Sequence, residues 1–506
     1  MPTQRLYIGL DLGTSGLKGV ALSDGGAVVA RAQASYPTHR PVPLAAEQDT
    51  ADWIMAAESA LRELARQCNC DEWAGIGLSG MLPTLVTLSA SNLPNGPAVT
   101  WEDARAELQG SRLRELIGAD DLYRLTGQWL DGRYLLPMFE RIAEDVHLRA
   151  SQTAAICSAK DYLFLHLTGA LATDPSTASG FGCYGLEAGA WLPEVVSAAR
   201  ARLTGSSPEL PEVMSATTTR PLLPCVAATL GLRAGLPICL GAADSVLGAL
   251  GLGVRAHGEV AYVAGTSSVI LGVSSHLVFD HSHRYLVTPM ADEGVFGLEM
   301  DLLATGSSLA WLAGVLLESR SPEAVGALAA QIAPEEAPVF LPYLGGGEQG
   351  ALWDPCLKGS LIGLDLRHGR GHLARALLNG IVLESRRCLA VLEEAGLPPS
   401  TVHLAGGSAG VPGFAAELAD ATGRRVTAQP DGDTDSSAAG AAILAAIAVD
   451  GASMERVFAL GSGGAQVTEP ESGRAAVWDH LFARHGRALA AVRSFDDGPD
   501  ELREDA

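Results

Sequence analysis

The chain has 506 residues and a formal net charge of −23, and lysine occurs at only three positions. This length is sufficient for two or more domains with sizeable hydrophobic cores. The acidic balance disfavours nucleic acid and anionic membranes as partners, because both carry the same sign of charge. A small anionic ligand remains compatible, since a local cluster of backbone N–H groups binds phosphate irrespective of net charge.

The ends, the apolar segments and the cysteines predict a cytoplasmic protein. No basic segment followed by an apolar run opens the chain, so we expect no signal peptide. The most apolar helical segment, 438–449, is too short and too rich in alanine to span a bilayer. The eight cysteines are scattered without a paired CxxC pattern, which indicates neither a zinc site nor a disulfide framework. We therefore expect reduced thiols and a cytoplasmic location.

Two similar segments lie about half a chain apart. Residues 6–34 predict three strands joined by tight turns, and the first turn has the sequence Gly-Thr-Ser-Gly. Residues 260–273 repeat a strand, a Gly-Thr-Ser turn and a strand, which indicates an internal duplication. Such turns offer N–H and O–H donors to a phosphate, and Asp11 just before the first turn could orient a metal ion or its waters. An ordinary hairpin with one exposed aspartate fits the first segment equally well.

The rest of the chain alternates predicted strands and helices. A helix over 53–68 is preceded by Asp49-Thr-Ala-Asp52, a segment that suits an N-cap, and a strand over 97–105 ends in Trp101-Glu-Asp-Ala-Arg105. The tryptophan, the acid and the arginine could line a polyol site, although a core tryptophan beside a surface ion pair is the simpler interpretation. Residues 106–200 are mostly helical, and helix capping with a salt bridge accounts for the charges of 158–161. Further helices are expected over 302–316, 373–392, 414–421, 438–449 and 478–492, and the acidic end over 495–506 is expected to be frayed.

The turn over 406–410 supports two competing hypotheses. A strand, a glycine-rich turn and a helix bring the backbone close to a nucleotide. The same residues match the G-x-S-x-G elbow of a serine hydrolase. The required order of residues is met by Ser408, then Asp433 or Asp435, then His480 or His485. The hydrolase hypothesis leaves both hairpins unexplained, whereas a P-loop ATPase is excluded because no Gly-Lys pair occurs in the chain. A dinucleotide fold is disfavoured because the first strand leads into a second strand.

Short motifs along nearly the whole chain form an ordered pattern. They are Tyr7–Gly16, Leu44–Asp49, Pro97–Asp103, Lys160–Leu163, Gly241–Asp244, Gly265–Ser267, Phe340–Leu344, Gly406–Gly407, Leu418–Asp420 and Ala438–Ala442. With this pattern the chain resembles the sugar kinases of the FGGY family, within the actin-like ATPase superfamily, and among them it is most similar to the xylulokinases. Each motif is short, and their order and spacing carry the resemblance.

The resemblance implies an α/β fold of two duplicated actin-like (ribonuclease H-like) domains with an interdomain cleft. The expected N-terminal domain, residues 1–254, would bind the sugar and contain the first phosphate loop and the catalytic base. The C-terminal domain, residues 255–470, would bind the nucleotide, and residues 471–506 would form a helix and an acidic tail.

The resemblance also implies a role for individual residues. Asp244 would be the catalytic base, and Asp11 would help to position Mg²⁺. The two phosphate loops would be Gly13, Thr14 and Ser15, and Gly265, Thr266 and Ser267. The adenosine would lie against Gly306, Gly406, Gly407 and Ala409. The sugar would be held by Met81, Leu82, Trp101, Asp103 and Ser245. This set suits phosphoryl transfer, which needs positioning and charge neutralisation more than covalent help, although an aspartate at position 244 could simply cap a helix.

Three departures from the family pattern affect the substrate. Met81–Thr84 replaces Gln-Met-His-Gly, so a sugar-contacting histidine is missing. Leu136–Phe139 lacks a lysine of the first family signature, and Gly347–Pro355 replaces a Gly-Glu-Arg-x-Pro run. We expect ATP- and Mg²⁺-dependent phosphorylation of D-xylulose to D-xylulose 5-phosphate. The alternatives are another ketose, a polyol such as glycerol, or gluconate, and from other classes the hydrolase or a non-catalytic nucleotide-binding module. A homodimer is compatible with the family.

Overall fold

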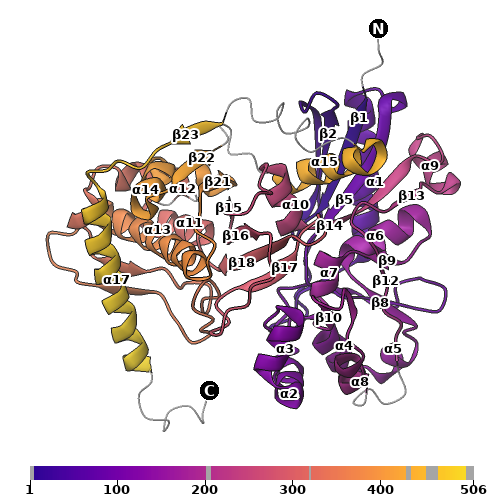
Figure 1. Cartoon of the computed structure of the whole chain (residues 1–506), viewed down its shortest axis with the longest axis horizontal. Coiled ribbons are helices and arrows are strands. Elements are labelled where there is room, and N and C mark those ends of the chain that lie inside the picture. The colour runs from indigo at the N-terminus through magenta and orange to yellow at the C-terminus, as the bar shows by residue number, and fades with distance from the viewer. Residues whose placement is uncertain are drawn as a thin grey trace. The chain divides into compact units, whose positions relative to one another are not determined.

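The computed structural model describes residues 5–200, 207–317, 319, 321–428, 435–451 and 465–496. The chain divides into two compact units, each assembled from three separate segments (Figure 1). The first unit comprises residues 1–253, 286–297 and 435–463, and the second comprises residues 254–285, 298–434 and 464–506. The predicted domains 1–254, 255–470 and 471–506 are continuous in the sequence, whereas these units are not, so the predicted boundaries stay a prediction.

The first unit is built on a six-stranded sheet with the order β13-β14-β5-β1-β2-β3. The predicted meander over 6–34 is confirmed, because β1, β2 and β3 pair antiparallel in succession. Strand β5 lies parallel to β1, β14 lies parallel to β5, and β13 pairs antiparallel with β14. The strands are β1 (Leu6–Leu12), β2 (Gly16–Ser23), β3 (Val28–Ser35), β5 (Trp73–Gly80), β13 (Thr219–Pro221) and β14 (Pro237–Ala243).

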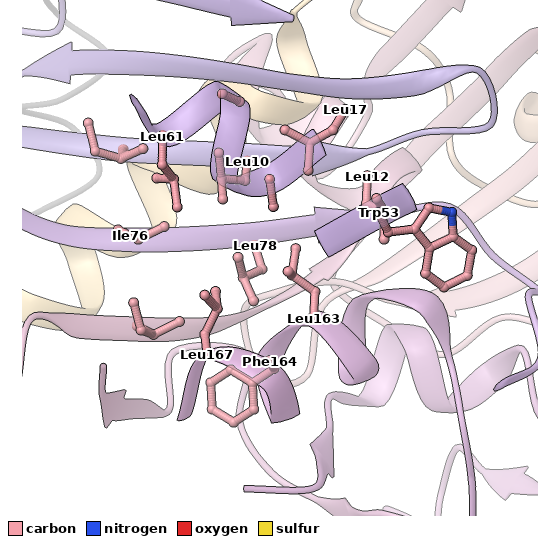
Figure 2. Packing of buried hydrophobic residues seen from close by; sticks show 14 of the residues in the cluster. Leu10, Leu12, Leu17, Trp53, Leu61, Ile76, Leu78, Leu163, Phe164 and Leu167 are labelled. Atoms are coloured by element: carbon pink, nitrogen blue, oxygen red, sulfur yellow. The ribbon is translucent and has the colours of Figure 1, made fainter. Parts of the chain in front are cut away.

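Apolar side chains pack α1 (Thr50–Gln67) and α6 (Ala159–Thr168) over one face of this sheet (Figure 2). Figure 2 shows Leu10 and Leu78 from neighbouring strands pointing toward this layer. The predicted cap of α1 is confirmed, since the Asp49 carboxylate accepts a hydrogen bond of 2.9 Å from the Ala51 N–H. Because side chains alternate along a strand, Gly9 and Asp11 lie on the opposite face from Leu10.

Helix α15 (Ser436–Asp450) packs on this sheet against β1, β5 and β14. Glycines permit the approach: a Cβ on Gly9 would lie 1.8 Å from the Ala438 carbonyl oxygen, and one on Gly77 would lie 2.0 Å from that of Ala441. Helix α10 (Asp244–Gly251) crosses α15 in the same way, since a Cβ on Gly440 would lie 1.9 Å from the Leu247 carbonyl oxygen. The alanine-rich sequence of α15 therefore serves close packing, as predicted for a core helix.

A second apolar cluster of the first unit is formed mainly by the region over 106–200 that was predicted to be helical. Its helices are α2 (Glu107–Ile117), α3 (Ala119–Thr126), α4 (Leu135–Asp145), α5 (His147–Ser151) and α8 (Pro193–Arg200). The predicted strand over 97–105 is wrong beyond β7 (Ala98–Val99), because the chain turns there: the Asp103 N–H donates to the Thr100 carbonyl oxygen at 3.0 Å. The Asp103 carboxylate also accepts from the Arg105 N–H at 3.0 Å, an Asx-type contact that favours a turn over a strand.

The second unit repeats the strand order of the first, with β18-β16-β15-β21-β22-β23 side by side. Strand β15 pairs antiparallel with β16 and parallel with β21, β21 pairs parallel with β22, and β23 closes the edge antiparallel. These directions match the β2-β1-β5-β14-β13 series, which confirms the predicted duplication. The strands are β15 (Glu259–Ala264), β16 (Ser268–Ser274), β18 (Phe296–Leu302), β21 (Thr401–Ala405), β22 (Arg425–Ala428) and β23 (Gln466–Thr468).

The helices predicted in this half of the chain are confirmed with shifts of a few residues at their ends. They are α11 (Gly306–Leu317), α13 (Arg370–Glu394), α14 (Phe414–Thr422) and α17 (Ala475–Asp496). The structure adds α12 (Pro322–Ala329), which was not predicted. Residues 497–506 of the predicted frayed end lie outside the described residues. Within the described ranges, no helix combines the length and the apolar character needed to cross a bilayer.

Candidate active site

Asp11 lies at the end of β1, directly across from Lys18 in the β1–β2 ladder. Its Oδ1 accepts a hydrogen bond of 2.7 Å from the Ser79 hydroxyl of the neighbouring strand β5. Burial raises the pKa of Asp11, while the Ser79 bond and the Lys18 charge act in the opposite direction. A carboxylate with few protein donors in a desolvated position is suited to a cation.

The turn that follows β1 is fixed by side chains from outside the hairpin. The Gln48 amide donates to the Thr14 carbonyl oxygen at 2.7 Å, and the Trp101 indole N–H donates to the Thr14 hydroxyl at 2.9 Å. The Tyr36 hydroxyl donates to the carbonyl oxygen of Gly13. Ser15 at the tip of the turn is exposed. The structure therefore brings Trp101, predicted from the sugar-binding set, into contact with the first predicted phosphate loop.

The predicted sugar-binding residues differ in accessibility. Met81 is 1 % exposed and belongs to the core of the first unit, and its N–H donates to the Leu12 carbonyl oxygen at 2.9 Å. Leu82 next to it is half-buried. Asp103 is buried, and both of its carboxylate oxygens accept hydrogen bonds from Arg105, while Oδ2 also accepts from the Ala46 N–H at 2.9 Å. Its contacts within the protein therefore give Asp103 a structural role.

Asp244 begins helix α10 immediately after strand β14. The strand is bulged just before its end, where Gly241 has a φ of 79° and an added Cβ would lie 1.6 Å from the Leu78 carbonyl oxygen. The cap position is Ala243, so Asp244 is the first helical residue, and its Oδ1 accepts from the Ser245 N–H at 2.9 Å. The positive end of the helix dipole stabilises an ionised carboxylate at this place.

The Ser245 hydroxyl is a candidate ligand for a substrate. Ser245 is half-buried, and its Oγ has no hydrogen-bond partner among the residues that the structure describes. Buried hydroxyls are normally paired, so an unpaired one beside Asp244 indicates a place where an outside group could bind.

Three segments of the second unit converge around the second Gly-Thr-Ser turn. The Gly306 N–H donates to the Gly265 carbonyl oxygen at 3.2 Å, and the Ser307 N–H donates to that of Thr266 at 3.0 Å. The Ser408 hydroxyl also donates to the Gly265 carbonyl oxygen, at 3.4 Å. A Cβ on Gly306 would lie 2.3 Å from the Gly265 oxygen, so only glycine permits this approach. The turn over 265–267, the start of α11 and the turn over 406–410 thus form one cluster.

The turn after β21 has one crowded side and one open side. Gly406 has a φ of 95°, and an added Cβ would lie 2.5 Å from the Ala264 carbonyl oxygen. A Cβ on Gly407 or Gly410 would meet no atom within 4 Å. The Ala409 N–H donates to the Gly406 carbonyl oxygen at 3.0 Å and closes the turn. A glycine turn that is pressed against β15 on one side and open on the other suits the close approach of a nucleotide.

Among the residues that the structure describes, the contacts do not form the Ser–Asp–His arrangement of the hydrolase hypothesis. Ser408 is 5 % exposed, and its hydroxyl donates to a backbone carbonyl. His485 Nε2 contacts Glu384 Oε1 at 2.6 Å, and Asp435 pairs with Lys18 and Arg31. His480 is exposed on α17, and Asp433 lies outside the described residues.

Within the described part of the chain, no group of three or more histidine, cysteine, aspartate or glutamate residues could hold a metal ion. Mg²⁺ at a phosphoryl-transfer site takes one or two carboxylates and keeps waters and phosphate oxygens as its other ligands. A single Asp11 carboxylate beside a glycine turn fits this pattern.

Comparison with known proteins identifies the class. Residues 6–251 match the N-terminal domain, and residues 260–449 the C-terminal domain, of the FGGY family of carbohydrate kinases. The xylulose kinase of Escherichia coli (strain K12) is 31 % identical over 88 % of this chain and 90 % of its own length. The gluconokinase of Bacillus subtilis (strain 168) is 26 % identical over 74 % of each chain. The crystal structure of xylulose kinase from Rhodospirillum rubrum superposes with a TM-score of 0.87 at 28 % identity, covering 97 % of this chain and 100 % of that chain.

Fold and comparisons together define a sugar kinase, a phosphotransferase with two actin-like α/β domains that uses ATP. The chain belongs to the FGGY family of carbohydrate kinases.

Proposed function

We propose that this kinase phosphorylates D-xylulose to D-xylulose 5-phosphate with Asp244 as the general base. The observation that carries the base assignment is the position of Asp244, half-buried at the first turn of α10 beside the unpaired Ser245 hydroxyl. The xylulose kinases among the relatives support the acceptor. Because one relative is a gluconokinase, gluconate is the main alternative acceptor. Other ketoses and polyols such as glycerol are further alternatives.

In the proposed reaction Asp244 takes the proton of the acceptor hydroxyl while that oxygen attacks the γ-phosphorus of ATP. A bond forms between the sugar oxygen and phosphorus, the bond to the β–γ bridging oxygen breaks, and ADP leaves. A carboxylate is an adequate base because the hydroxyl becomes acidic only as the new bond forms. The half-buried position of Asp244 limits its access to bulk water, which favours transfer to the sugar over hydrolysis.

The phosphates of ATP are assigned to the two Gly-Thr-Ser turns, and the adenosine to the cluster around the second turn. The open side of Gly407 and the crowded contact of Gly306 with Gly265 support this assignment. The residues proposed to contact the nucleotide are Gly13, Thr14, Ser15, Gly265, Thr266, Ser267, Gly306, Gly406, Gly407 and Ala409. Asp11 would hold Mg²⁺, which when bound neutralises charge on the phosphate oxygens.

The sugar is assigned to the surface formed by Leu82, Trp101 and Ser245. The half-buried side chains of all three support direct contact, with the indole against C–H groups and the serine hydroxyl as a hydrogen-bond partner. Met81 and Asp103 would shape this surface from beneath, because both are buried. Pro83 stands where the family pattern has a histidine and offers no side-chain hydrogen-bonding group, so we propose that the acceptor is recognised with one hydrogen bond fewer at this position.

The proposal extends to location and assembly. We propose a cytoplasmic enzyme, since all eight cysteines are free thiols and the substrate ATP is intracellular. We also propose a homodimer, which sedimentation equilibrium would test directly.

The test is ADP release from Mg-ATP with D-xylulose, other ketoses, glycerol and gluconate as acceptors, with Asp244→Asn as the control. We expect turnover with D-xylulose that the variant lacks, while the variant still binds ATP. If only gluconate supports turnover, the proposed acceptor is wrong and the proposed mechanism stands. Undiminished turnover by Asp244→Asn would overturn the assignment of the base.

A further inference from the structure

A fully buried lysine lies beneath the end of strand β14. Lys160 is 0 % exposed, and its Nζ lies 3.1 Å from Asp161 Oδ1, 3.2 Å from Asp174 Oδ1 and 3.2 Å from the Leu240 carbonyl oxygen. Both aspartates are buried as well. The sequence predicted only a capped helix with a local salt bridge here, and the contacts with Asp174 and Leu240 join segments far apart in the chain.

Burying these three charged groups costs more free energy than capping a helix would require. Burial alone would lower the pKa of Lys160, but the charges of Asp161 and Asp174 raise it above its ordinary value, so the amine stays charged. Desolvating such charges costs several kcal/mol per ion, and an apolar substitute of similar volume is often neutral or stabilising. The capping box of Ser158 and Asp161 accounts for one acid only. A role beyond stability would explain the second.

From Asp174 the network leads to the residue before Asp244. The Ser176 hydroxyl donates to Asp174 Oδ2, and the same oxygen of Ser176 accepts from the Ala243 N–H at 2.9 Å. Ser176 is 1 % exposed, so water does not substitute for it readily. Strand β13 pairs with β14 only as far as Cys239. Beyond it the Leu240 and Gly241 N–H groups donate to the carbonyl oxygens of Thr218 and Ala216, and the Ala243 N–H donates to the Ser176 hydroxyl instead of a backbone carbonyl. Ser176 supplies the acceptor that the sheet does not.

A second serine binds the backbone of Asp244 itself. The Ser437 hydroxyl, in the first turn of α15, donates to the Asp244 carbonyl oxygen at 2.9 Å. Hydroxyls from two different helices therefore bind the backbone around Asp244, at the N–H of the preceding residue Ala243 and at the carbonyl oxygen of Asp244 itself.

We infer that Ser176, oriented by Asp174 and Lys160, and Ser437 are positioning residues that fix the backbone of Asp244 and thereby aim its carboxylate at the acceptor hydroxyl. This inference rests on the proposed function of Asp244 as the base. Neither serine takes part in proton transfer. Their effect belongs to the chemical step, because a displacement of about 1 Å at a reacting group can cost on the order of 100-fold in rate.

The chain offers a matched control on the same helix, α7 (Pro175–Ser179). Ser179 is 2 % exposed, and its hydroxyl donates within the helix to the Pro175 carbonyl oxygen at 3.2 Å. Ser176→Ala and Ser179→Ala remove the same atom from equally buried positions. We expect Ser176→Ala to lower kcat by roughly 10- to 100-fold with KM for ATP changed by less than about twofold, whereas Ser179→Ala leaves kcat within about twofold.

A double-mutant cycle with Asp244→Asn separates positioning from general damage to the fold. The residual rate of Asp244→Asn is measured at high enzyme concentration and long incubation, beyond the conditions of the standard assay. If Ser176 acts through Asp244, adding Ser176→Ala to Asp244→Asn lowers that residual rate no further, and Ser437→Ala behaves in the same way. Equal kcat for Ser176→Ala and Ser179→Ala, with only a lower melting temperature for the first, would overturn the inference. A rate loss that multiplies with that of Asp244→Asn would overturn it as well. Undiminished turnover by Asp244→Asn alone is a separate result that removes the proposed base.

Discussion

The two Gly-Thr-Ser hairpins have the same backbone arrangement and different charges. In the first, Asp11 of β1 lies across from Lys18 of β2, whereas the strand position before the second turn has Val263 across from Val269. The first turn is held by the side chains of Gln48, Tyr36 and Trp101. The second is held by backbone N–H groups at the start of α11 and by Ser408.

This difference indicates how a duplicated fold acquires separate tasks. Both copies keep a turn that can bind phosphate through its own N–H and O–H groups. The first has a carboxylate, Asp11, in the strand before its turn, where the second has Val263, and strand β14 of the first copy continues directly into Asp244 at the start of α10. The second adds glycines with open space beside them, Gly407 and Gly410, in the turn that we propose to contact the nucleotide. We expect substitutions in the two copies to affect different steps.

The largest expected effect is at the charged hairpin. Asp11→Asn removes the carboxylate proposed to hold Mg²⁺ and should lower kcat by on the order of 100-fold or more, with a higher Mg²⁺ concentration for half-maximal rate. Steady-state rates at several Mg²⁺ concentrations measure both. Val263→Thr at the corresponding position is the matched control and should leave the Mg²⁺ dependence unchanged. An equal shift in both variants would contradict the division of tasks.

The second largest effect is expected from a substitution that crowds the second Gly-Thr-Ser turn. Gly306→Ala places a Cβ 2.3 Å from the Gly265 carbonyl oxygen, so we expect a loss of about 1–3 kcal/mol in the free energy of unfolding together with weaker ATP binding. Gly407→Ala enters open space and should leave the stability unchanged while it weakens ATP binding. Denaturant unfolding and ATP titration of both variants provide the comparison. Unchanged ATP affinity in both would remove this cluster from the nucleotide site.

Two buried glutamates of the second unit should respond to pH in opposite directions. Burial, with the Glu384 charge, raises the pKa of Glu348 to about 8, although the N–H groups of Leu303 and Gln349 partly offset it. Burial would raise the pKa of Glu384 too, but the His485 hydrogen bond and the Arg387 charge lower it to about 2.

Between the ordinary glutamate pKa and about 8, folded Glu348 binds more protons than the unfolded chain does, so stability falls as the pH rises, by at most about 1.4 kcal/mol per pH unit. Glu348→Gln should remove this slope. For Glu384 the stabilisation is present above the ordinary pKa and is lost as the pH falls toward about 2, so Glu384→Gln should destabilise the protein at neutral pH. Unfolding curves across this range measure both, and a slope unchanged by Glu348→Gln would disprove the assignment.

The smallest expected effect concerns the support of the first turn. Trp101→Phe removes the N–H that donates to the Thr14 hydroxyl and should cost about 0.5–1.5 kcal/mol in stability, with a few-fold rise in KM for the acceptor. Trp53→Phe is a control that removes an indole N–H bonded to Gln48 instead, and should change stability with a smaller effect on acceptor KM. The reverse order of the two KM effects would argue against Trp101 at the sugar site.

Local patterns in the sequence predicted much of the fold. The meander over 6–34 and the helix beginning after Asp49 follow from turn residues, caps and periodicity, which act over a few positions. The strand over 97–105 was predicted too long because Asp103 bonds its own neighbour Arg105 and turns the chain. The place of α15 in the first unit depends on glycines of β1 and β5, which no local pattern joins to it.

The candidate site was predictable where family motifs mark it and not where distant residues meet. Asp11, Asp244 and the two turns lie within recognisable motifs. The contact of Lys160 with Asp174 and the bond of Ser176 to Ala243 arise only when α6, α7 and β14 pack together. Lys160 is one of only three lysines and opens the motif Lys160–Leu163, but neither signal connects it with Asp174 or Leu240.

The most direct measurement for the central claim is phosphorus NMR of the products formed from Mg-ATP and D-xylulose by the native enzyme and by Asp244→Asn. The account predicts equal amounts of ADP and a sugar phosphate ester from the native enzyme, and neither from the variant under the same conditions. Free inorganic phosphate in place of the ester, or equal ester formation by the variant, would contradict it.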